Sequence, residues 1–244
     1  GLEERDAKWV SAAVYTTLGH LLYIDHVIAA YTKGSIKPQI RGILRLGVCQ
    51  VLYMGVPDSA ACNESVKLAK EIGKGPLSGF VNGVMRNICR NKDNPPPLPG
   101  EPVKRLSIQY SYPEYLVKEY MGQYGAGFTE AMLSAMSDPG CMTVRAQYPY
   151  TSEQLEKALE ERSIGFSRGR IVEDAFKLEK GFDVTKEPLF TEGRITVQSE
   201  SAMLVCRALE PKEGMHILDV CAAPGGKSAY IASLTQGGAV IDSW

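Results

Sequence analysis

The residues best suited to chemistry in this 244-residue chain lie in one turn near its end. Residues 219–228 read Asp-Val-Cys-Ala-Ala-Pro-Gly-Gly-Lys-Ser, and they join an apolar strand expected over 216–220 to a helix expected over 227–234. Small residues let a ligand approach the backbone closely, and the first turn of a helix offers unpaired N–H groups and a positive dipole end. In open α/β sheets, nucleotides bind in the crevice at the carboxyl ends of the strands. The turn is therefore a candidate cofactor site.

Four interpretations of this turn stay open from its spacing alone. Gly226-Lys227-Ser228 matches the end of a phosphate-binding P-loop, but Cys221 stands where that motif needs glycine, and Pro224 lacks a backbone donor. A dinucleotide fingerprint needs G-x-G-x-x-G, which is absent. A methyltransferase turn that binds S-adenosylmethionine needs small residues here and an acid after the next strand, for which Asp242 is a candidate. The fourth interpretation is a tight turn that binds nothing.

The elements that must position the turn form one β-α-β unit. A helix over 201–209 precedes the first strand, and Gly237-Gly238 ends the second helix before a strand that starts at 239–242. Such units belong to parallel sheets. The chain stops within the second strand, so we expect the gene to continue past Trp244.

The first third of the chain predicts a compact all-α bundle over residues 7–92. Its clearest apolar stripe recurs at helical spacing, with short breaks at 55–58 and 73–76 between the helices; the stripe comprises Leu77, Phe80, Val81, Val84 and Ile88. A proline-rich stretch follows, and it favours a stiff extended spacer. The next hundred residues mix expected helices and strands. The helices are 113–124, 129–136 and one capped by Thr151 and Gln154, and the strands are 141–146, 171–172 and 195–197.

Composition excludes several classes of protein. Hydrophobic residues make up 44% and charged residues 23%, which is typical of a globular protein and not of a disordered one. No apolar run of about 18 residues occurs, so no membrane span is predicted. The start of the chain lacks the apolar core of a signal peptide. The six cysteines form no C-x-x-C pair and the three histidines are not spaced as ligands, so we expect reduced thiols, a cytoplasmic protein and no metal.

Basic residues are concentrated in the first third of the chain. Its residues 1–92 hold 12 basic and 7 acidic side chains, although the net charge of the whole chain is −1. Lys37, Arg41 and Arg45 lie four apart and form one stripe on a helix, while Arg86 and Arg90 lie near the end of the last bundle helix. We interpret them as candidate RNA contacts, with an ordinary solvated face as the alternative.

Three parts of the chain resemble known families. Residues 218–228 resemble the first motif of the ribosomal RNA cytosine-C5 methyltransferases, and residues 190–200 resemble the segment before that motif. Residues 41–53 and 79–86 resemble the antitermination factor NusB. The resemblance implies a multidomain α and α/β fold, with an all-α NusB-like bundle, a small α+β RNA-binding domain and the start of a Rossmann-like methyltransferase sheet.

The implied domains are a NusB-like bundle over 1–92 without its first helix, a linker over 93–102, an RNA-binding domain over 103–198 and an incomplete methyltransferase domain over 199–244. The strand around Arg145 resembles part of that RNA-binding domain, which makes Arg145 a further candidate for RNA contact.

The resemblance also implies the reaction and its ligands. The substrate would be C5 of a cytosine in small-subunit ribosomal RNA, and the methyl donor would be S-adenosyl-L-methionine. Asp219 is expected to orient the turn. The implied cofactor-binding residues are Cys221, Ala222, Ala223, Pro224, Gly225, Gly226 and Lys227. Asp242 is added if the family's ribose-binding acid aligns with this position and not with one beyond Trp244.

In the family, the catalytic cysteines belong to a later Pro-Cys and a later Thr-Cys motif, and the Thr-Cys thiolate attacks C6 of the base. The chain ends before both motifs, so we predict no catalytic residue within it and expect the fragment to be an inactive monomer. Cys221 is expected to line the cofactor pocket and not to be the nucleophile. The alternative function is a non-enzymatic RNA- or protein-binding module of the NusB antitermination type.

Overall fold

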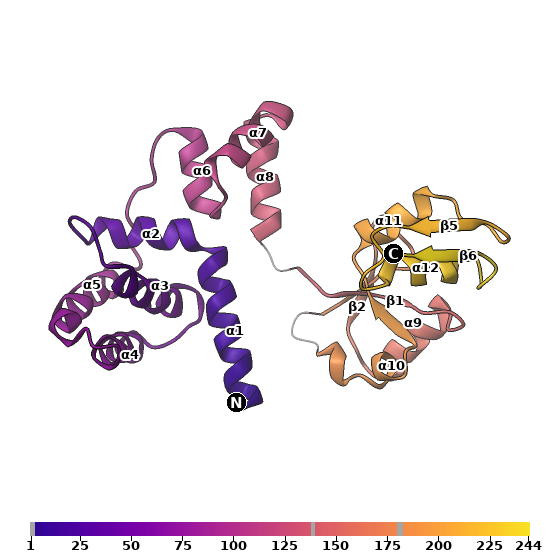
Figure 1. Ribbon diagram of the computed structural model, residues 1–244, viewed down its shortest axis with the longest axis horizontal. Helices are drawn as coiled ribbons and strands as arrows, with labels where there is room; N and C mark the ends of the chain where they lie inside the picture. Colours follow the sequence, from indigo (N-terminus) through magenta and orange to yellow (C-terminus); the bar gives the residue numbers. More distant parts are fainter. Residues whose placement is uncertain (1–2, 138–139, 180–182) are drawn as a thin grey trace. The chain divides into compact units, whose positions relative to one another are not determined.

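The computed structural model describes residues 3–137, 140–179 and 183–244 (Figure 1). The chain divides into two compact units, an N-terminal unit over Gly1–Asp138 and a C-terminal unit over Pro139–Trp244. Among the described residues, no helix is long and apolar enough to cross a membrane.

The first part of the N-terminal unit is a helical bundle, as predicted. Pro38 begins its central helix in the position where a proline costs no hydrogen bond. The apolar stripe predicted from residue 77 onwards lies mostly on the buried face of the last bundle helix. The helices are α1 (Glu4–Gly19), α2 (Leu21–Ala30), α3 (Pro38–Tyr53), α4 (Asp58–Glu71), the short η1 (Gly75–Leu77) and α5 (Ser78–Arg90).

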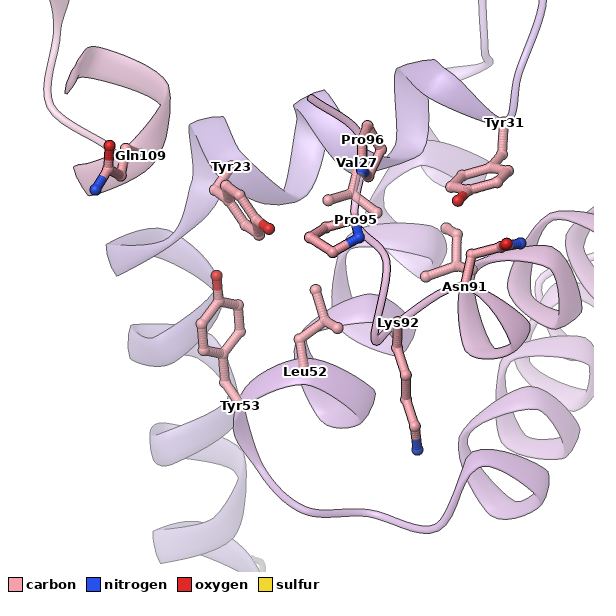
Figure 2. A pocket seen from close by; sticks show the side chains of 11 residues that line it. Tyr23, Val27, Tyr31, Leu52, Tyr53, Asn91, Lys92, Pro95, Pro96 and Gln109 are labelled. Atoms are coloured by element: carbon pink, nitrogen blue, oxygen red, sulfur yellow. The ribbon is translucent and has the colours of Figure 1, made fainter. Parts of the chain in front are cut away.

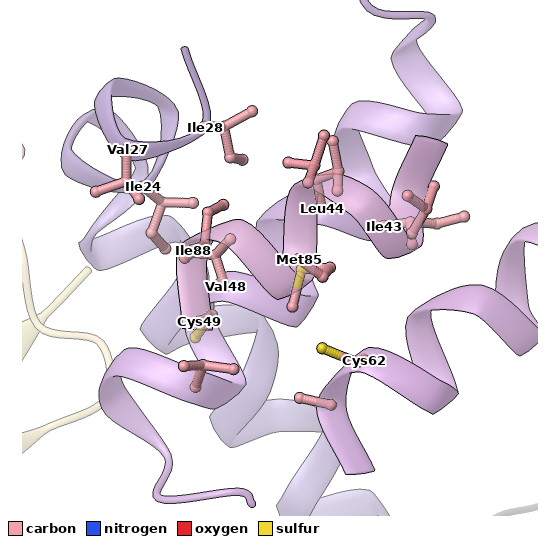
Figure 3. Close-up of a cluster of buried hydrophobic side chains, with 14 of the residues drawn as sticks. Ile24, Val27, Ile28, Ile43, Leu44, Val48, Cys49, Cys62, Met85 and Ile88 are labelled. Atoms are coloured by element: carbon pink, nitrogen blue, oxygen red, sulfur yellow. The ribbon is translucent and has the colours of Figure 1, made fainter. Parts of the chain in front are cut away.

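The core of the bundle is formed where α3 crosses its neighbours. Leu44, Val48 and Met85 are fully buried there, and Figure 3 shows them among the side chains of α2, α3, α4 and α5. Gly47 permits the close approach, because a Cβ at its position would lie 2.5 Å from Ser65 Oγ and 2.8 Å from Met85 Cε. Beside this core, the sulfur atoms of Cys62 on α4 and Cys89 on α5 lie 3.7 Å apart.

Three further helices, α6 (Pro102–Tyr110), α7 (Glu114–Tyr124) and α8 (Ala126–Ser137), complete the N-terminal unit. Leu106, Val117 and Leu133 form their small core. They are joined to the bundle by contacts between α6 and α2, including a hydrogen bond of 3.3 Å from the backbone N–H of Tyr23 to Ser111 Oγ. The compact units therefore divide near residue 138, and the domain bounds predicted from the sequence stay a prediction.

The C-terminal unit begins with an α+β domain around an antiparallel sheet of order β2-β3-β1-β4. Thr151 and Gln154 form the predicted capping box at the start of its longest helix. Its elements are β1 (Thr143–Ala146), α9 (Ser152–Glu161), β2 (Phe166–Arg168), β3 (Phe176–Leu178), η2 (Val184–Lys186), α10 (Pro188–Thr191) and β4 (Ile195–Val197).

One predicted strand of this domain is wrong. Ile171 and Val172 lie in the connection between β2 and β3, where Ile171 is 70% exposed and Val172 is buried. The carboxylate of Glu200 accepts hydrogen bonds from both of their backbone N–H groups, at 2.8 and 3.2 Å, so these donors are not available to a sheet. The real partners in the sheet, β2 and β3, have three residues each.

The unit ends with α11 (Glu200–Ala208), β5 (His216–Asp219), α12 (Gly226–Leu234) and β6 (Val240–Ser243). The strands β5 and β6 pair in parallel, with Asp219 opposite Ser243. The predicted β-α-β unit is therefore confirmed, and it places the turn between β5 and α12 at the carboxyl end of a parallel pair.

The contacts of Glu200 predict a stability that depends on pH. Its carboxylate lies 2.6 Å from Lys177 Nζ, and this contact together with the two backbone N–H groups lowers the pKa of Glu200 from 4.5 to about 2. The stabilisation is therefore complete above pH 4.5 and is lost as the pH falls towards 2. We expect Glu200→Gln to lower the free energy of unfolding of the C-terminal unit by about 2 kcal/mol at pH 7.

Urea unfolding of both proteins at pH 7 and at pH 3 checks this prediction. The difference between Glu200→Gln and the parent chain should shrink at the lower pH. Glu161→Gln is the matched control, because Glu161 is exposed and pairs at 3.8 Å with Lys157, which is also exposed, and it should change the stability by less than about 0.5 kcal/mol. A difference for Glu200→Gln that is the same at both pH values would contradict the ionic explanation.

Candidate cofactor site

The carboxylate of Asp219 fixes both ends of the turn. Its Oδ1 accepts the backbone N–H of Cys221 at 3.1 Å, and its Oδ2 accepts the hydroxyl of Ser228 at 2.7 Å. The Ser228 hydrogen bond, the Cys221 N–H and the charge of Lys227 hold the pKa of Asp219 below its usual range. An ionised Asp219 thus orients the turn, which confirms the bond to the backbone that the sequence predicted.

The middle of the turn is closed by backbone bonds. Gly225 has a φ of 100°, a conformation that glycine adopts without strain, and its N–H donates to the carbonyl of Ala222 at 2.5 Å. Residue Trp244, after β6, accepts the N–H of Ala222 at 3.2 Å and donates to the carbonyl of Asp219 at 2.9 Å. The turn is therefore held by both strands of the parallel pair.

A hollow of about 410 Å³ opens beside the turn, between α11, β5 and α12. Its volume falls in the range of small-molecule sites. The lining is largely apolar, with Lys227 as its cation, and includes Val205, Leu209, Ile217, Val220, Cys221 and Ile231. Within the described residues, the first N–H groups of α12, at Gly226 and Lys227, have no acceptor. The hollow thus combines apolar walls with unpaired donors and a positive charge.

The structure brings most of the predicted cofactor residues together. Residues 221–227 form the turn, with Cys221 exposed to the hollow and Ala222 nearly buried. Asp242 does not join them. It lies opposite Leu218, and its carboxylate contacts His216 Nε2 at 2.9 Å, back towards the amino end of β5. In this arrangement the carboxylate is engaged away from the turn.

Arg145 is the largest correction to the predicted site. It was expected to contact RNA, but its side chain has no exposed surface, so that prediction is wrong. From β1, its guanidinium donates to Gln198 Oε1 at 2.6 Å, to Gln147 Oε1 at 2.8 Å and to the carbonyl of Gly226 at 3.3 Å. Its carbon Cζ lies 4.8 Å from the ring centre of Tyr230 on α12. Arg145 therefore joins the α+β domain to the helix that carries the cofactor turn.

A second network strengthens the same junction. The hydroxyl of Tyr230 donates to Asp174 Oδ2 at 2.7 Å and accepts from Arg207 Nε at 2.9 Å. Arg207 also forms an ion pair with Asp174 at 2.6 Å. These contacts connect α11, α12 and the loop before β3, and short-range sequence patterns carry no signal for them.

The other candidate RNA contacts lie on the helical bundle. Lys37, Arg86 and Arg90 are exposed, and Arg41 is partly exposed. Arg45 is half-buried, and its Nε donates to Asp25 Oδ1 at 2.8 Å as part of a two-pronged ion pair, so its charge is already neutralised. RNA contact by the other four stays a prediction.

The bundle also has a hollow of its own, of about 380 Å³. Figure 2 shows the hydroxyls of Tyr23 and Tyr53 facing each other on one side of this hollow, while Tyr31 lies on the other side. Pro95 and Pro96 of the proline-rich segment lie between the two sides. The predicted spacer therefore packs against α2 instead of extending freely. Among the described residues, no group of His, Cys, Asp and Glu side chains could hold a metal ion.

Three family models match successive parts of the chain. The NusB family matches residues 1–90, the ferredoxin-like domain of RsmF/B-like methyltransferases matches residues 112–185, and the 16S rRNA methyltransferase RsmB/F family matches residues 206–243. The chain is 36% identical to the probable ribosomal RNA small subunit methyltransferase B of Bacillus subtilis, over 96% of this chain and 53% of that protein. It is 29% identical to ribosomal RNA small subunit methyltransferase B of Vibrio cholerae, over 98% of this chain and 55% of that protein.

Two solved structures are similar in fold. The crystal structure of PH0851 matches with a TM-score of 0.73 at 21% identity, over 99% of this chain and 55% of that one. A methyltransferase homologue from Pyrococcus horikoshii matches with a TM-score of 0.53 at 27% identity, over 59% of this chain and 48% of that one. The chain spans about half the length of the curated relatives it matches.

The chain thus combines a NusB-like bundle, a ferredoxin-like domain and a strand–turn–helix that matches the start of a methyltransferase domain. The resemblance stated from the sequence is thereby confirmed. Along its length the chain is similar to the RsmB/F type of 16S rRNA methyltransferase, whose family model matches residues 206–243.

Proposed function

We propose that the protein containing this chain transfers a methyl group from S-adenosylmethionine to C5 of a cytosine in small-subunit ribosomal RNA. The observation that carries the proposal is the turn over 221–227, which Asp219 fixes beside a hollow of about 410 Å³. The named relatives are small-subunit ribosomal RNA methyltransferases, which supports this substrate. The cytoplasm is the location that we propose with this substrate, because a ribosomal RNA substrate would be met there.

The residues of the hollow fit this cofactor better than a nucleoside triphosphate. Unpaired N–H groups at the start of α12 and the cation of Lys227 suit a single carboxylate. Pro224 lacks the N–H that a P-loop would direct at a phosphate. The apolar lining suits the uncharged faces of an adenosine. When bound, S-adenosylmethionine supplies an electrophilic methyl group on sulfur, and the turn would hold the amino-acid end of the molecule.

The roles within the chain follow from this arrangement. Asp219 holds the turn in its binding conformation, Cys221 lines the hollow and Lys227 supplies positive charge. In the family that the chain resembles, the nucleophilic thiolate belongs to a Thr-Cys motif, a dipeptide that residues 1–244 do not contain. Methyl transfer therefore needs residues of the whole protein besides those described here.

Calorimetric titration of the chain with S-adenosylmethionine tests the proposal, with ATP–magnesium as the parallel ligand. We expect S-adenosylmethionine to bind and ATP–magnesium not to bind. Lys227→Ala should weaken the binding of S-adenosylmethionine about tenfold, because it removes a charge-assisted contact. Lys212→Ala is the matched control, since Lys212 is exposed outside the hollow. Binding of ATP–magnesium alone would overturn the assignment.

A second function is supported by the charge of the bundle. Lys37, Arg41, Arg86 and Arg90 leave positive side chains at its surface, and the NusB family matches this part of the chain. We propose that the N-terminal unit binds RNA through these residues. The joint change of Arg86 and Arg90 to alanine should weaken RNA binding and reduce the slope of affinity against salt by about 2. An unchanged slope in a fluorescence titration would contradict this role.

A further inference from the structure

The side chain of Gln198, just after β4, has a buried donor with no partner. Gln198 is 7% exposed, and its Nε2 has no hydrogen-bond partner in the structure. A buried amide donor without an acceptor costs about 1–3 kcal/mol. Such a group is uncommon in folded proteins, and a ligand that supplies the acceptor is one explanation for it.

Arg145 determines which way the Gln198 amide faces. Its Nε donates to Gln198 Oε1 at 2.6 Å, and a guanidinium can only donate hydrogen bonds. The oxygen of the amide must therefore face Arg145, and the nitrogen must face elsewhere. Gln198 Nε2 lies 4.0 Å from the position that a Cβ on Gly226 would occupy. The unpartnered donor thus sits beside the first residue of α12.

Two cations, Arg145 and Lys227, lie near Gly226, and the nearby carboxylates of Asp174 and Asp219 are hydrogen-bonded to other groups. Burial lowers the pKa of Arg145 to about 10, so its guanidinium is charged at neutral pH. Within the described residues, Arg145 has no carboxylate at ion-pair distance, and its polar partners are amide and carbonyl oxygens and the Ser233 hydroxyl. The N–H groups at the start of α12 and the charge of Lys227 add to the same field. Burying a cation without a carboxylate at ion-pair distance costs folding free energy. An anionic ligand that binds nearby would offset that cost.

We propose that Gln198 donates a hydrogen bond to the carboxylate of the methyl donor's amino-acid part, and that Arg145 positions Gln198 for this contact. The inference rests on the proposed function, because Gln198 lies beside Gly226 of the cofactor turn, although neither Gln198 nor Arg145 lines the hollow itself. It gives the α+β domain a direct part in cofactor binding, through one side chain that follows β4 and another from β1. Gln198 is thus a binding residue, and Arg145 is a positioning residue behind it.

Two ligands separate this role from a general effect on the fold. S-adenosylhomocysteine carries the amino-acid carboxylate, and 5′-methylthioadenosine lacks it. The change Gln198→Glu keeps an oxygen towards Arg145 but removes the donor and places a negative charge beside the carboxylate. We expect it to weaken S-adenosylhomocysteine binding by about 30-fold or more and to leave 5′-methylthioadenosine binding within about twofold. The melting temperature should be unchanged or higher, because the new carboxylate neutralises Arg145.

Gln147→Leu is the matched control. Gln147 also accepts a hydrogen bond from Arg145, at 2.8 Å, but among the described residues the atoms within 4 Å of a Cβ on Gly226 belong to Gln198 and not to Gln147. It should change the affinities for both ligands by less than about threefold. Arg145→Lys should weaken S-adenosylhomocysteine selectively, as expected for a residue that acts through Gln198.

The outcomes are distinct. Equal weakening of both ligands by Gln198→Glu would overturn the inference, because it would mean that the change disturbs the whole site. Equal affinity of the parent chain for the two ligands would also overturn it, because no carboxylate would be recognised. If the parent chain bound neither ligand, the cofactor site of the proposed function would fail and the inference with it. Selective loss of S-adenosylhomocysteine binding would support both.

Discussion

The change Arg145→Ala is expected to lower the free energy of unfolding of the C-terminal unit by about 3 kcal/mol. The side chain is fully buried and donates to Gln198, Gln147 and the carbonyl of Gly226. Its removal takes one donor from each of these acceptors and opens a cavity beside Tyr230. Relief of the buried charge offsets part of the loss, so the expected value stays below that of a broken buried ion pair.

Urea unfolding followed by circular dichroism measures this change. Arg194→Ala is the control, because Arg194 is half-exposed and pairs with Glu192 at the surface, and it should cost less than about 1 kcal/mol. Arg145→Lys keeps the charge but has fewer donors, so its loss should be intermediate. A cost for Arg145→Ala below about 0.5 kcal/mol would show that the network does not hold the junction together.

The second large effect is expected in the helical bundle. Gly47→Val should destabilise the N-terminal unit by about 3 kcal/mol, because α3 lies too close to α4 and α5 to accept a branched side chain. Even its Cβ would lie 2.5 Å from Ser65 Oγ and 2.8 Å from Met85 Cε. Met85 is fully buried, so the end of its side chain would have to shift within the core to make room.

Gly42→Ala supplies a control in the same helix. No atom lies within 4 Å of a Cβ at Gly42, so this change should stabilise the unit by up to about 1 kcal/mol through helix propensity. Guanidinium unfolding, followed by the fluorescence of Trp9 on α1, compares the two variants. If Gly47→Val were as stable as the parent chain, the packing of α3 against α4 and α5 would not restrict the size of the residue at position 47.

The helical bundle and the cofactor turn could be predicted because each is visible as a local pattern in the sequence. The stripe that ends at Ile88 has the period of a helix and lies mostly on the buried face of α5. The turn from Asp219 to Ser228 is contiguous, so its chemistry is visible in one short run. The strands β2 and β3 have three residues each, which is too short to show an alternation, and their place in the sheet is set by pairing with β1.

The role of Arg145 could not be predicted, for a related reason. Its partners Gln198 and Gly226 are 53 and 81 residues away along the chain. A single arginine in a strand is equally compatible with a surface contact to RNA, and only the folded junction shows that it is buried. The same holds for Asp174, whose ion pair with Arg207 spans 33 residues.

The neighbouring thiols of Cys62 and Cys89 have a consequence for oxidation chemistry. Their sulfur atoms lie 3.7 Å apart, but burial raises the pKa of Cys89 to about 12. Disulfide formation and exchange proceed through the thiolate, and this raised pKa keeps Cys89 in the thiol form at pH 7. Proximity alone therefore does not make Cys89 reactive. The contact between α4 and α5 should persist as packed thiols during mild oxidative stress, while the exposed Cys141 and Cys221 react first.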